Sequence, residues 1–204
     1  AFKEAEAPYD IKNIRHIITY LDSDDTELKL FDEIKTVDGK DINNLEDVRK
    51  IVDSREIGAK MNIEVLRNDK LISVSSKVYE KEGRKLLGIS LTNVYEVSTD
   101  PEVEIKIKSN ESGPSGGLMM ALSVYNSLVK EDISKGKKII GTGTIDIDGN
   151  VGEIGGVKYK LIGAVKNKSD IFLCPKENYE EAIKVAKDNN YSIKIISVGT
   201  LKEA

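Results

Sequence analysis

A serine flanked by glycines stands in the run Gly113-Pro114-Ser115-Gly116-Gly117, where a strand is predicted to turn into a helix. Residues 103–108 alternate apolar and charged side chains, which is typical of a strand, and the apolar run 118–129 indicates a buried helix. Glycines allow a tight turn, and the start of a helix presents unpaired N–H groups and the positive end of its dipole. This place would stabilise an anion, either a phosphate or the oxyanion of acyl transfer.

The glycine-rich turn has other interpretations. Ser115 could be a simple helix N-cap. A Walker phosphate loop requires Lys-Ser/Thr after its last glycine, but Leu118-Met119 follow here, and the glycine spacing of a dinucleotide fingerprint is absent. The Gly-x-Ser-x-Gly pattern of a nucleophile elbow does fit. It predicts acyl transfer, with Ser115 as nucleophile and backbone N–H groups at Gly113 and Gly116 holding the oxyanion.

A serine nucleophile requires a base. The only histidine, His16, lies in a strand-like run that favours a structural role. A lysine can replace histidine if desolvation keeps its amine neutral. Lys158 and Lys160 lie on a predicted helix after Gly155-Gly156, and the helical wheel does not choose between them. The alternative for both is a solvated surface lysine.

Three motifs in order resemble the proteolytic domain of Lon proteases, from about residue 103 to the end of the chain. They are Gly-Pro-Ser-Gly-Gly at 113–117, Gly-Thr-Gly-Thr at 141–144 and Asp-Gly-Asn-Val-Gly-Glu-Ile-Gly-Gly-Val-Lys-Tyr-Lys at 148–160. That family uses a Ser-Lys dyad, so the resemblance implies Ser115 as nucleophile and Lys160 as base. Thr142 matches a family threonine and is expected either to orient Lys160 by a hydrogen bond or to pair within the sheet. Gly116 replaces the usual alanine, and Ser112 stands where many members have aspartate.

The N-terminal part predicts a β-rich domain. Strands are expected at 13–21 and 33–37, hairpins at Asp38-Gly39 and at 67–70, and a helix after Asn43 or Asn44. The runs 28–34, Leu-Lys-Leu-Phe-Asp-Glu-Ile, and 37–40, Val-Asp-Gly-Lys, resemble a bacterial-type PDZ domain. Phe31 replaces the glycine of that motif, and no carboxylate-binding loop is recognisable before Ile14. The domain is therefore expected to be a PDZ-like peptide binder or a spacer.

The charged link 80–84 predicts the domain boundary, giving a PDZ-like domain at 9–84 and a Lon-type proteolytic domain at 85–204. In the second domain we expect strands at 137–144, 171–174 and 192–198, a hairpin turn at 148–150, and helices running to 167 and over 177–189. Strands and helices mix without strict alternation, so the predicted fold class is α+β.

Composition narrows the function classes. The 204 residues carry a formal net charge of −4, and no basic patch interleaves with aromatic residues, which argues against nucleic acid as a partner. The single cysteine, Cys174, lies in an apolar run, which favours a buried structural thiol.

No cofactor and no metal are expected. The predicted function is an ATP-independent serine endopeptidase that cleaves peptides or unfolded proteins, and the alternative is a non-catalytic adaptor that binds protein tails.

A PDZ domain joined to a Lon-type domain without an ATPase module resembles the membrane-anchored PDZ–Lon proteins of Gram-positive-type bacteria. This resemblance implies an N-terminal membrane anchor, a protease domain outside the cytoplasm, a peptide ligand at the PDZ-like domain and a homo-oligomeric ring, commonly a hexamer, in the full-length protein. Because the sequence begins at Ala1 without methionine, we expect a fragment lacking that anchor, monomeric or weakly associating.

Overall fold

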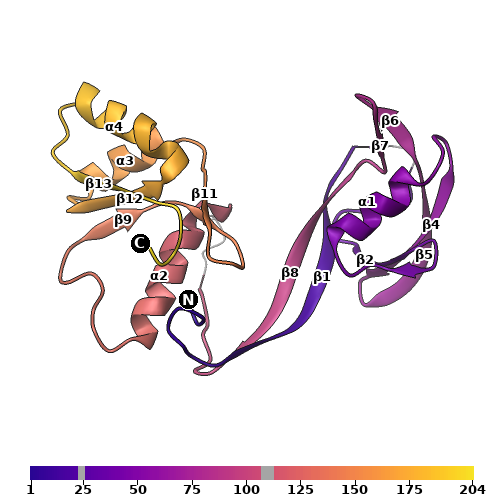
Figure 1. Cartoon of the computed structure of the whole chain (residues 1–204), viewed down its shortest axis with the longest axis horizontal. Helices are drawn as coiled ribbons and strands as arrows, with labels where there is room; N and C mark the ends of the chain where they lie inside the picture. Colours follow the sequence, from indigo (N-terminus) through magenta and orange to yellow (C-terminus); the bar gives the residue numbers. More distant parts are fainter. Residues whose placement is uncertain (23–25, 107–112) are drawn as a thin grey trace. The chain divides into compact units, whose positions relative to one another are not determined.

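The computed structural model describes residues 1–22, 26–106 and 113–204. Within it the chain forms two compact units (Figure 1). One comprises residues 10–98, and the other combines residues 1–9 with residues 99–204. Each unit has a hydrophobic core of its own, and the two are described separately.

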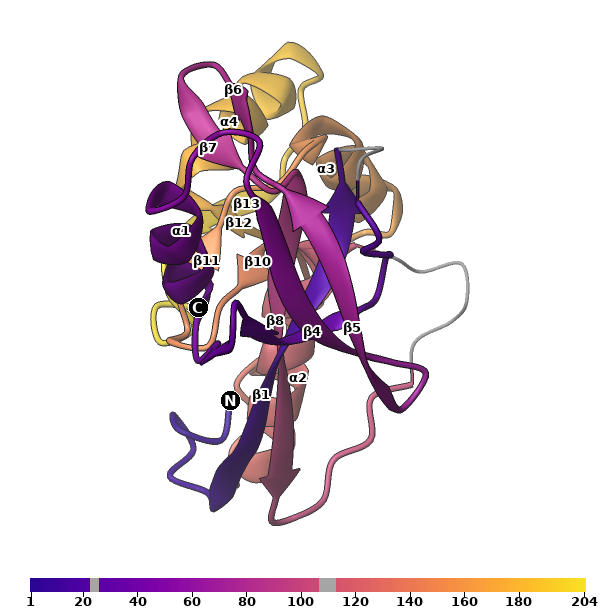
Figure 2. The same cartoon turned by 90° about the vertical axis from the view of Figure 1, so that its right-hand side faces the viewer.

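The first unit, residues 10–98, is a sheet covered by one helix. Its strands are β1 (Tyr9–Leu21), β2 (Glu33–Val37), β3 (Lys40–Asp41), β4 (Lys60–Arg67), β5 (Lys70–Lys77) and β8 (Ile89–Thr99). They run in the order β5-β4-β2-β1-β8, with β3 paired to β2. The helix is α1 (Leu45–Asp53), and a separate hairpin of β6 (Tyr79–Lys81) and β7 (Arg84–Leu86) lies beside it (Figure 2).

The tight turns of this unit follow from residues that adopt positive φ. Asp38 and Gly39 join β2 to β3 with φ of 50° and 74°, and Asn68 and Asp69 join β4 to β5 with φ of 50° and 60°. Two successive positive φ angles match the twist of an antiparallel pair. Both predicted hairpins are therefore confirmed. The expected charged link 80–84 is instead a third hairpin, β6–β7, because Glu82-Gly83 adopts the same conformation.

Burial of one helix face and of the sheet's inner face builds the core. Asn44 is the N-cap of α1 and its side chain accepts from the Asp47 amide, as the sequence predicted. Val48, Ile51 and Val52 form the buried stripe of the helix. They pack with fully buried sheet residues, among them Ile18, Ile34, Val37, Met61, Ile63 and Val65.

Two buried carboxylates hold the loops around β2. Arg67 on β4 makes two hydrogen bonds of 2.7 Å to Asp32, one from Nε and one from Nη2. Glu33 is almost fully buried and accepts from Arg15 Nε at 2.7 Å and from Lys35 Nζ. These charge-assisted hydrogen bonds offset the desolvation of the two carboxylates.

The second unit packs helices against a short parallel sheet. Its sheet order is β13-β12-β9, from β9 (Ile139–Gly141), β12 (Ile171–Pro175) and β13 (Lys194–Val198), and a hairpin is formed by β10 (Thr144–Ile145) and β11 (Val151–Gly152). The helices are α2 (Gly117–Leu128), α3 (Val157–Lys166) and α4 (Tyr179–Asp188), with single 3-10 turns at Pro114–Gly116 and Lys176–Asn178. The α+β class predicted from the sequence is confirmed.

Two expectations about residues 80–106 are wrong. The first unit extends to Ser98, past the boundary expected after Arg84, because β8 pairs with β1 and completes the first sheet. Residues 103–106 are not a strand, although their side chains alternate, because they have no neighbouring strand to pair with in the part of the chain that the structure describes. The rest of that predicted strand, residues 107–108, lies outside the described residues.

The helices that the structure describes are all too short or too polar to cross a bilayer.

Candidate active site

Ser115 lies in a 3-10 turn, Pro114–Gly116, that leads directly into α2. Gly113 precedes it with φ 92° and ψ 154°, a backbone conformation essentially restricted to glycine. The chain therefore turns sharply just before the serine, as the nucleophile-elbow pattern predicted. Ser115 itself is half-buried. Ser112, which stands where many members of the family that the sequence resembles have aspartate, lies outside the described residues.

The backbone of Ser115 is fixed by the segment that follows β9. The Ser115 carbonyl oxygen accepts from the Gly143 amide at 2.8 Å and from Thr142 Oγ1 at 3.0 Å. In return the Leu118 amide donates to the Gly143 carbonyl at 3.0 Å. A Cβ on Gly143 would lie 2.8 Å from Val151 Cγ1, so this close approach requires glycine. The serine turn and the residues after β9 thus hold each other in place.

Lys160 reaches the serine from α3. This helix begins after Gly156, which has φ 71°, and it is anchored by the fully buried side chains of Val157 and Leu161. Lys160 is half-buried, and its Nζ donates to Ser115 Oγ at 2.8 Å. Lys158, two residues earlier, is exposed. The geometry therefore distinguishes two lysines that the helical wheel could not.

The side chain of Thr142 contacts the serine backbone, a role that neither of the two alternatives from the sequence anticipated. The alternative of pairing within the sheet holds for its backbone, since the Thr142 amide donates to the Leu173 carbonyl oxygen at 3.0 Å. Its side chain is buried, and its hydroxyl donates to the carbonyl oxygen of Ser115. A hydroxyl has a single proton, so this bond is the one donation that the Thr142 side chain makes. Sequence reasoning missed this role, and Gly143 with it, because the contact joins residues 27 positions apart.

Gly116 has room for a side chain. Its φ of −91° and ψ of −6° suit any residue, and a Cβ there would meet Met120 Cε at 3.6 Å, an ordinary contact. The glycine in place of the usual alanine is therefore not required by the local backbone.

Two other candidate groups have structural surroundings. His16 belongs to the other unit, where it is buried and its Nδ1 lies 2.9 Å from Asn93 Oδ1. Cys174 is fully buried in β12, and burial raises the pKa of its thiol to about 11. Among the described residues, no three His, Cys, Asp or Glu side chains gather in a way that could hold a metal ion.

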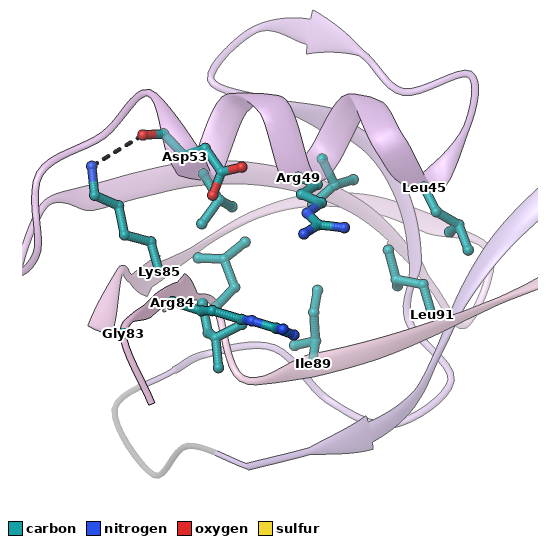
Figure 3. A pocket seen from close by; sticks show the side chains of 12 residues that line it. Leu45, Arg49, Asp53, Gly83, Arg84, Lys85, Ile89 and Leu91 are labelled. Carbon is teal, nitrogen blue, oxygen red and sulfur yellow. Dashed lines mark hydrogen bonds between the residues drawn. The ribbon is translucent and has the colours of Figure 1, made fainter. Parts of the chain in front are cut away.

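The first unit carries a groove of about 670 Å³ between α1 and the start of β8 (Figure 3). Its apolar lining comes from both elements, from the end of β7 and from the residue that follows β7. It consists of Leu45, Val48, Val52, Leu86, Leu87, Ile89 and Leu91. Because β8 ends the sheet order, its outer edge is unpaired in the described chain. The sequence showed no binding loop before Ile14, in front of the first strand. The groove is instead formed by α1 and β8, the last strand of the unit.

The family model of the Lon protease (S16) C-terminal proteolytic domain matches residues 98–204. Similar curated proteins include the Lon proteases of Campylobacter concisus, 35% identical over 98 residues, Neorickettsia sennetsu, 32% over 96, and Desulfatibacillum aliphaticivorans, 26% over 136. These matches cover 46%, 47% and 62% of this chain. They cover only 11%, 11% and 16% of the respective relatives, so the chain spans a small part of their length.

Among solved structures, the PDZ domain of an SdrC-like protein from Listeria monocytogenes is similar with a TM-score of 0.37 and 20% identity, over 40% of this chain and 92% of that chain. The family match is more extensive. It takes in both Ser115 and Lys160, whose side chains are in contact, and it covers more than half of the sequence. The chain therefore belongs to the family of Lon protease (S16) C-terminal proteolytic domains.

Proposed function

We propose that this chain is a serine endopeptidase in which Ser115 is the nucleophile and Lys160 the general base. The observation that carries the proposal is the 2.8 Å contact between Lys160 Nζ and Ser115 Oγ at the start of a helix. This distance lies within the range for proton transfer between a base and a nucleophile. When the amine is neutral, the same contact lets the serine hydroxyl donate to Nζ.

The proposed reaction uses only these two side chains and the backbone. Lys160 takes the proton from Oγ, which attacks the carbonyl carbon of a peptide bond. The N–H groups of Ser115 and Gly116, in the turn that begins the helix, would hold the oxyanion. Lys160 then protonates the leaving amine, and a water molecule, activated in the same way, releases the acyl group. Because these groups perform each proton transfer, we propose that peptide cleavage does not require ATP.

Cleavage of an unfolded protein such as casein tests the proposal. Ser115→Ala and Lys160→Ala should each abolish cleavage, and the double variant should be no worse than either single one, because the two side chains act as a unit. Lys160→Arg keeps a positive charge and a donor but cannot act as a base, so it should also be inactive. Lys158→Ala, two residues away and exposed, is the matched control and should remain active.

The rate should increase with pH, because a lysine accepts the serine proton only in its neutral form. Activity that persists in Ser115→Ala would reject the nucleophile. An inactive Lys158→Ala beside an active Lys160→Ala would move the base to Lys158. Circular dichroism of each variant separates loss of chemistry from loss of fold.

The groove between α1 and β8 favours a second function, binding of an extended peptide. An unpaired strand edge beside an apolar groove is the arrangement in which a peptide adds to a sheet, with its alternate side chains facing the helix. Anisotropy of a labelled peptide tests this function independently of cleavage, in the Ser115→Ala variant. A survey of extended peptides in which none binds would reject it.

A further inference from the structure

The groove between α1 and β8 contains two arginines whose guanidinium groups have no partner among the described residues. Arg49 lies on α1 and Arg84 on β7, and both side chains project toward the space between the helix and β8 (Figure 3). The other three arginines of the chain each pair with a carboxylate, Arg15 with Glu33, Arg55 with Asp38 and Arg67 with Asp32. In the described part of the chain, neither groove arginine makes an ion pair or a hydrogen bond through its guanidinium. The unpaired guanidinium groups therefore coincide with the groove.

The rest of the groove leaves this positive charge largely uncompensated. Lys85 also lines it, and its Nζ donates to the carbonyl oxygens of Asp53 and Arg55 at 3.0 and 2.6 Å, where it caps the C-terminal end of α1. Among the residues that the structure describes, the only carboxylate in the lining is that of Asp53. The described lining thus has three cations against one anion, on a chain whose net charge is −4.

The strand edge determines how a ligand would meet these charges. A segment added to β8 alternates its side chains between the two faces of the sheet, so residues two apart face α1 together. An apolar side chain of the ligand would then contact the apolar part of the groove lining at Leu87, Ile89 and Leu91. A carboxylate two positions away in the ligand would face the guanidinium groups of Arg49 and Arg84, and guanidinium groups bind carboxylates through paired hydrogen bonds.

We propose that this groove binds an extended acidic segment of a partner protein, in which a side-chain carboxylate next to an apolar residue on the same face is bound by Arg49 and Arg84. This inference rests on the peptide-binding function proposed above and specifies its ligand. Apolar contact and strand addition provide general affinity, and the two arginines select for negative charge.

Binding of labelled peptides to the full chain carrying Ser115→Ala tests the inference, since this substitution lies in the other unit and prevents cleavage. One peptide repeats Val-Ser-Glu-Ser, which places Val and Glu two residues apart on the same face, and it ends in an amide. Its matched partner has Gln in place of Glu. The acidic peptide should bind about tenfold more tightly, which corresponds to one charge-assisted contact, and added salt should reduce the difference. A third peptide, the Gln version with a free C-terminal carboxylate, tests whether the end of the chain is recognised instead.

Arg49→Glu should weaken binding of the acidic peptide at least tenfold and spare the Gln peptide. Lys50→Glu makes the same change of charge one residue further along α1, outside the groove lining, and should have little effect. Three results would each overturn the proposed preference for acidic peptides while leaving the groove as a peptide-binding site. They are equal binding of the Glu and Gln peptides, tight binding only with a free C-terminus, and equal losses of affinity in Arg49→Glu and Lys50→Glu. If none of the three peptides binds, both the selection and the groove's peptide function are rejected.

Discussion

Removing the hydroxyl of Thr142 should lower activity without changing its pH dependence. The hydroxyl donates to the Ser115 carbonyl oxygen at 3.0 Å, and Thr142→Val keeps the shape of the side chain while deleting that bond. The carbonyl retains the Gly143 amide at 2.8 Å, so it is not left without a partner. The loss is therefore that of one neutral hydrogen bond, about 0.5–1.5 kcal/mol of stability.

The effect on catalysis has an upper limit set by the same bond. If all of its energy serves to hold Ser115 against Lys160 in the transition state, the rate falls about tenfold, since 1.36 kcal/mol corresponds to a factor of ten. Steady-state cleavage of a fluorogenic peptide and urea unfolding measure the two quantities. Thr142→Ser is the matched control. It keeps the hydroxyl and loses a methyl group, at a cost of about 0.5–1.5 kcal/mol expected for a small cavity. It should be destabilised to a similar extent but close to wild type in rate.

The pH profile distinguishes two roles for Thr142. A threonine that holds the serine backbone leaves the protonation of Lys160 unchanged, so the profile of Thr142→Val should keep the wild-type midpoint. A shifted midpoint would mean that Thr142 acts on the lysine. Equal rates for wild type and Thr142→Val would show that the carbonyl contact does not position the nucleophile.

Three further outcomes follow from single residues. Gly116→Ala should remain active and gain about 0.4–1 kcal/mol in urea unfolding, because the new Cβ meets only Met120 Cε at 3.6 Å and the unfolded chain loses freedom; an inactive variant would contradict this. Burial raises the pKa of Glu33, but hydrogen bonds from Lys35 and Arg15 outweigh it and hold the pKa below its ordinary 4.5, so this group stabilises the fold above that pH and the contribution is lost on acidification. The free energy of unfolding of Glu33→Gln should therefore fall less steeply below about pH 4.5 than that of wild type. Identical dependence of stability on pH in the two proteins would contradict this role of Glu33. Cys174, with its pKa raised by burial to about 11, should resist iodoacetamide at pH 8 until urea unfolds the chain, as mass spectrometry would show.

The parts that the sequence predicted well are those in which local chemistry decides the structure. Asp38-Gly39 specifies its turn because few other pairs tolerate two positive φ angles, and the glycines around Ser115 identify a sharp turn before a helix. Lys160 could be assigned only through the resemblance. Its contact with Ser115 depends on how α3 packs, which the spacing of apolar residues leaves undetermined.

The parts that failed depend on distant partners. Residues 103–106 alternate like a strand, but alternation describes a half-buried face and supplies no neighbour to pair with. The boundary after Arg84 was wrong because the partner of β8, strand β1, lies at the other end of the unit. The groove was missed for the same reason, since its helix and its strand are separated by the whole β4–β7 region.

The order of the units along the chain makes the first one an insertion. Residues 1–9 and 99–204 form one compact body, and residues 10–98 leave and return through β1 and β8. At the point of departure the two segments are already joined, because the Asp100 amide donates to the Pro8 carbonyl oxygen at 3.1 Å. The proteolytic body can therefore be closed by a short turn between Pro8 and Asp100, and the inserted domain has its own two ends side by side. Such a module can be gained, lost or exchanged in evolution, or removed in the laboratory, without cutting the fold that carries Ser115 and Lys160.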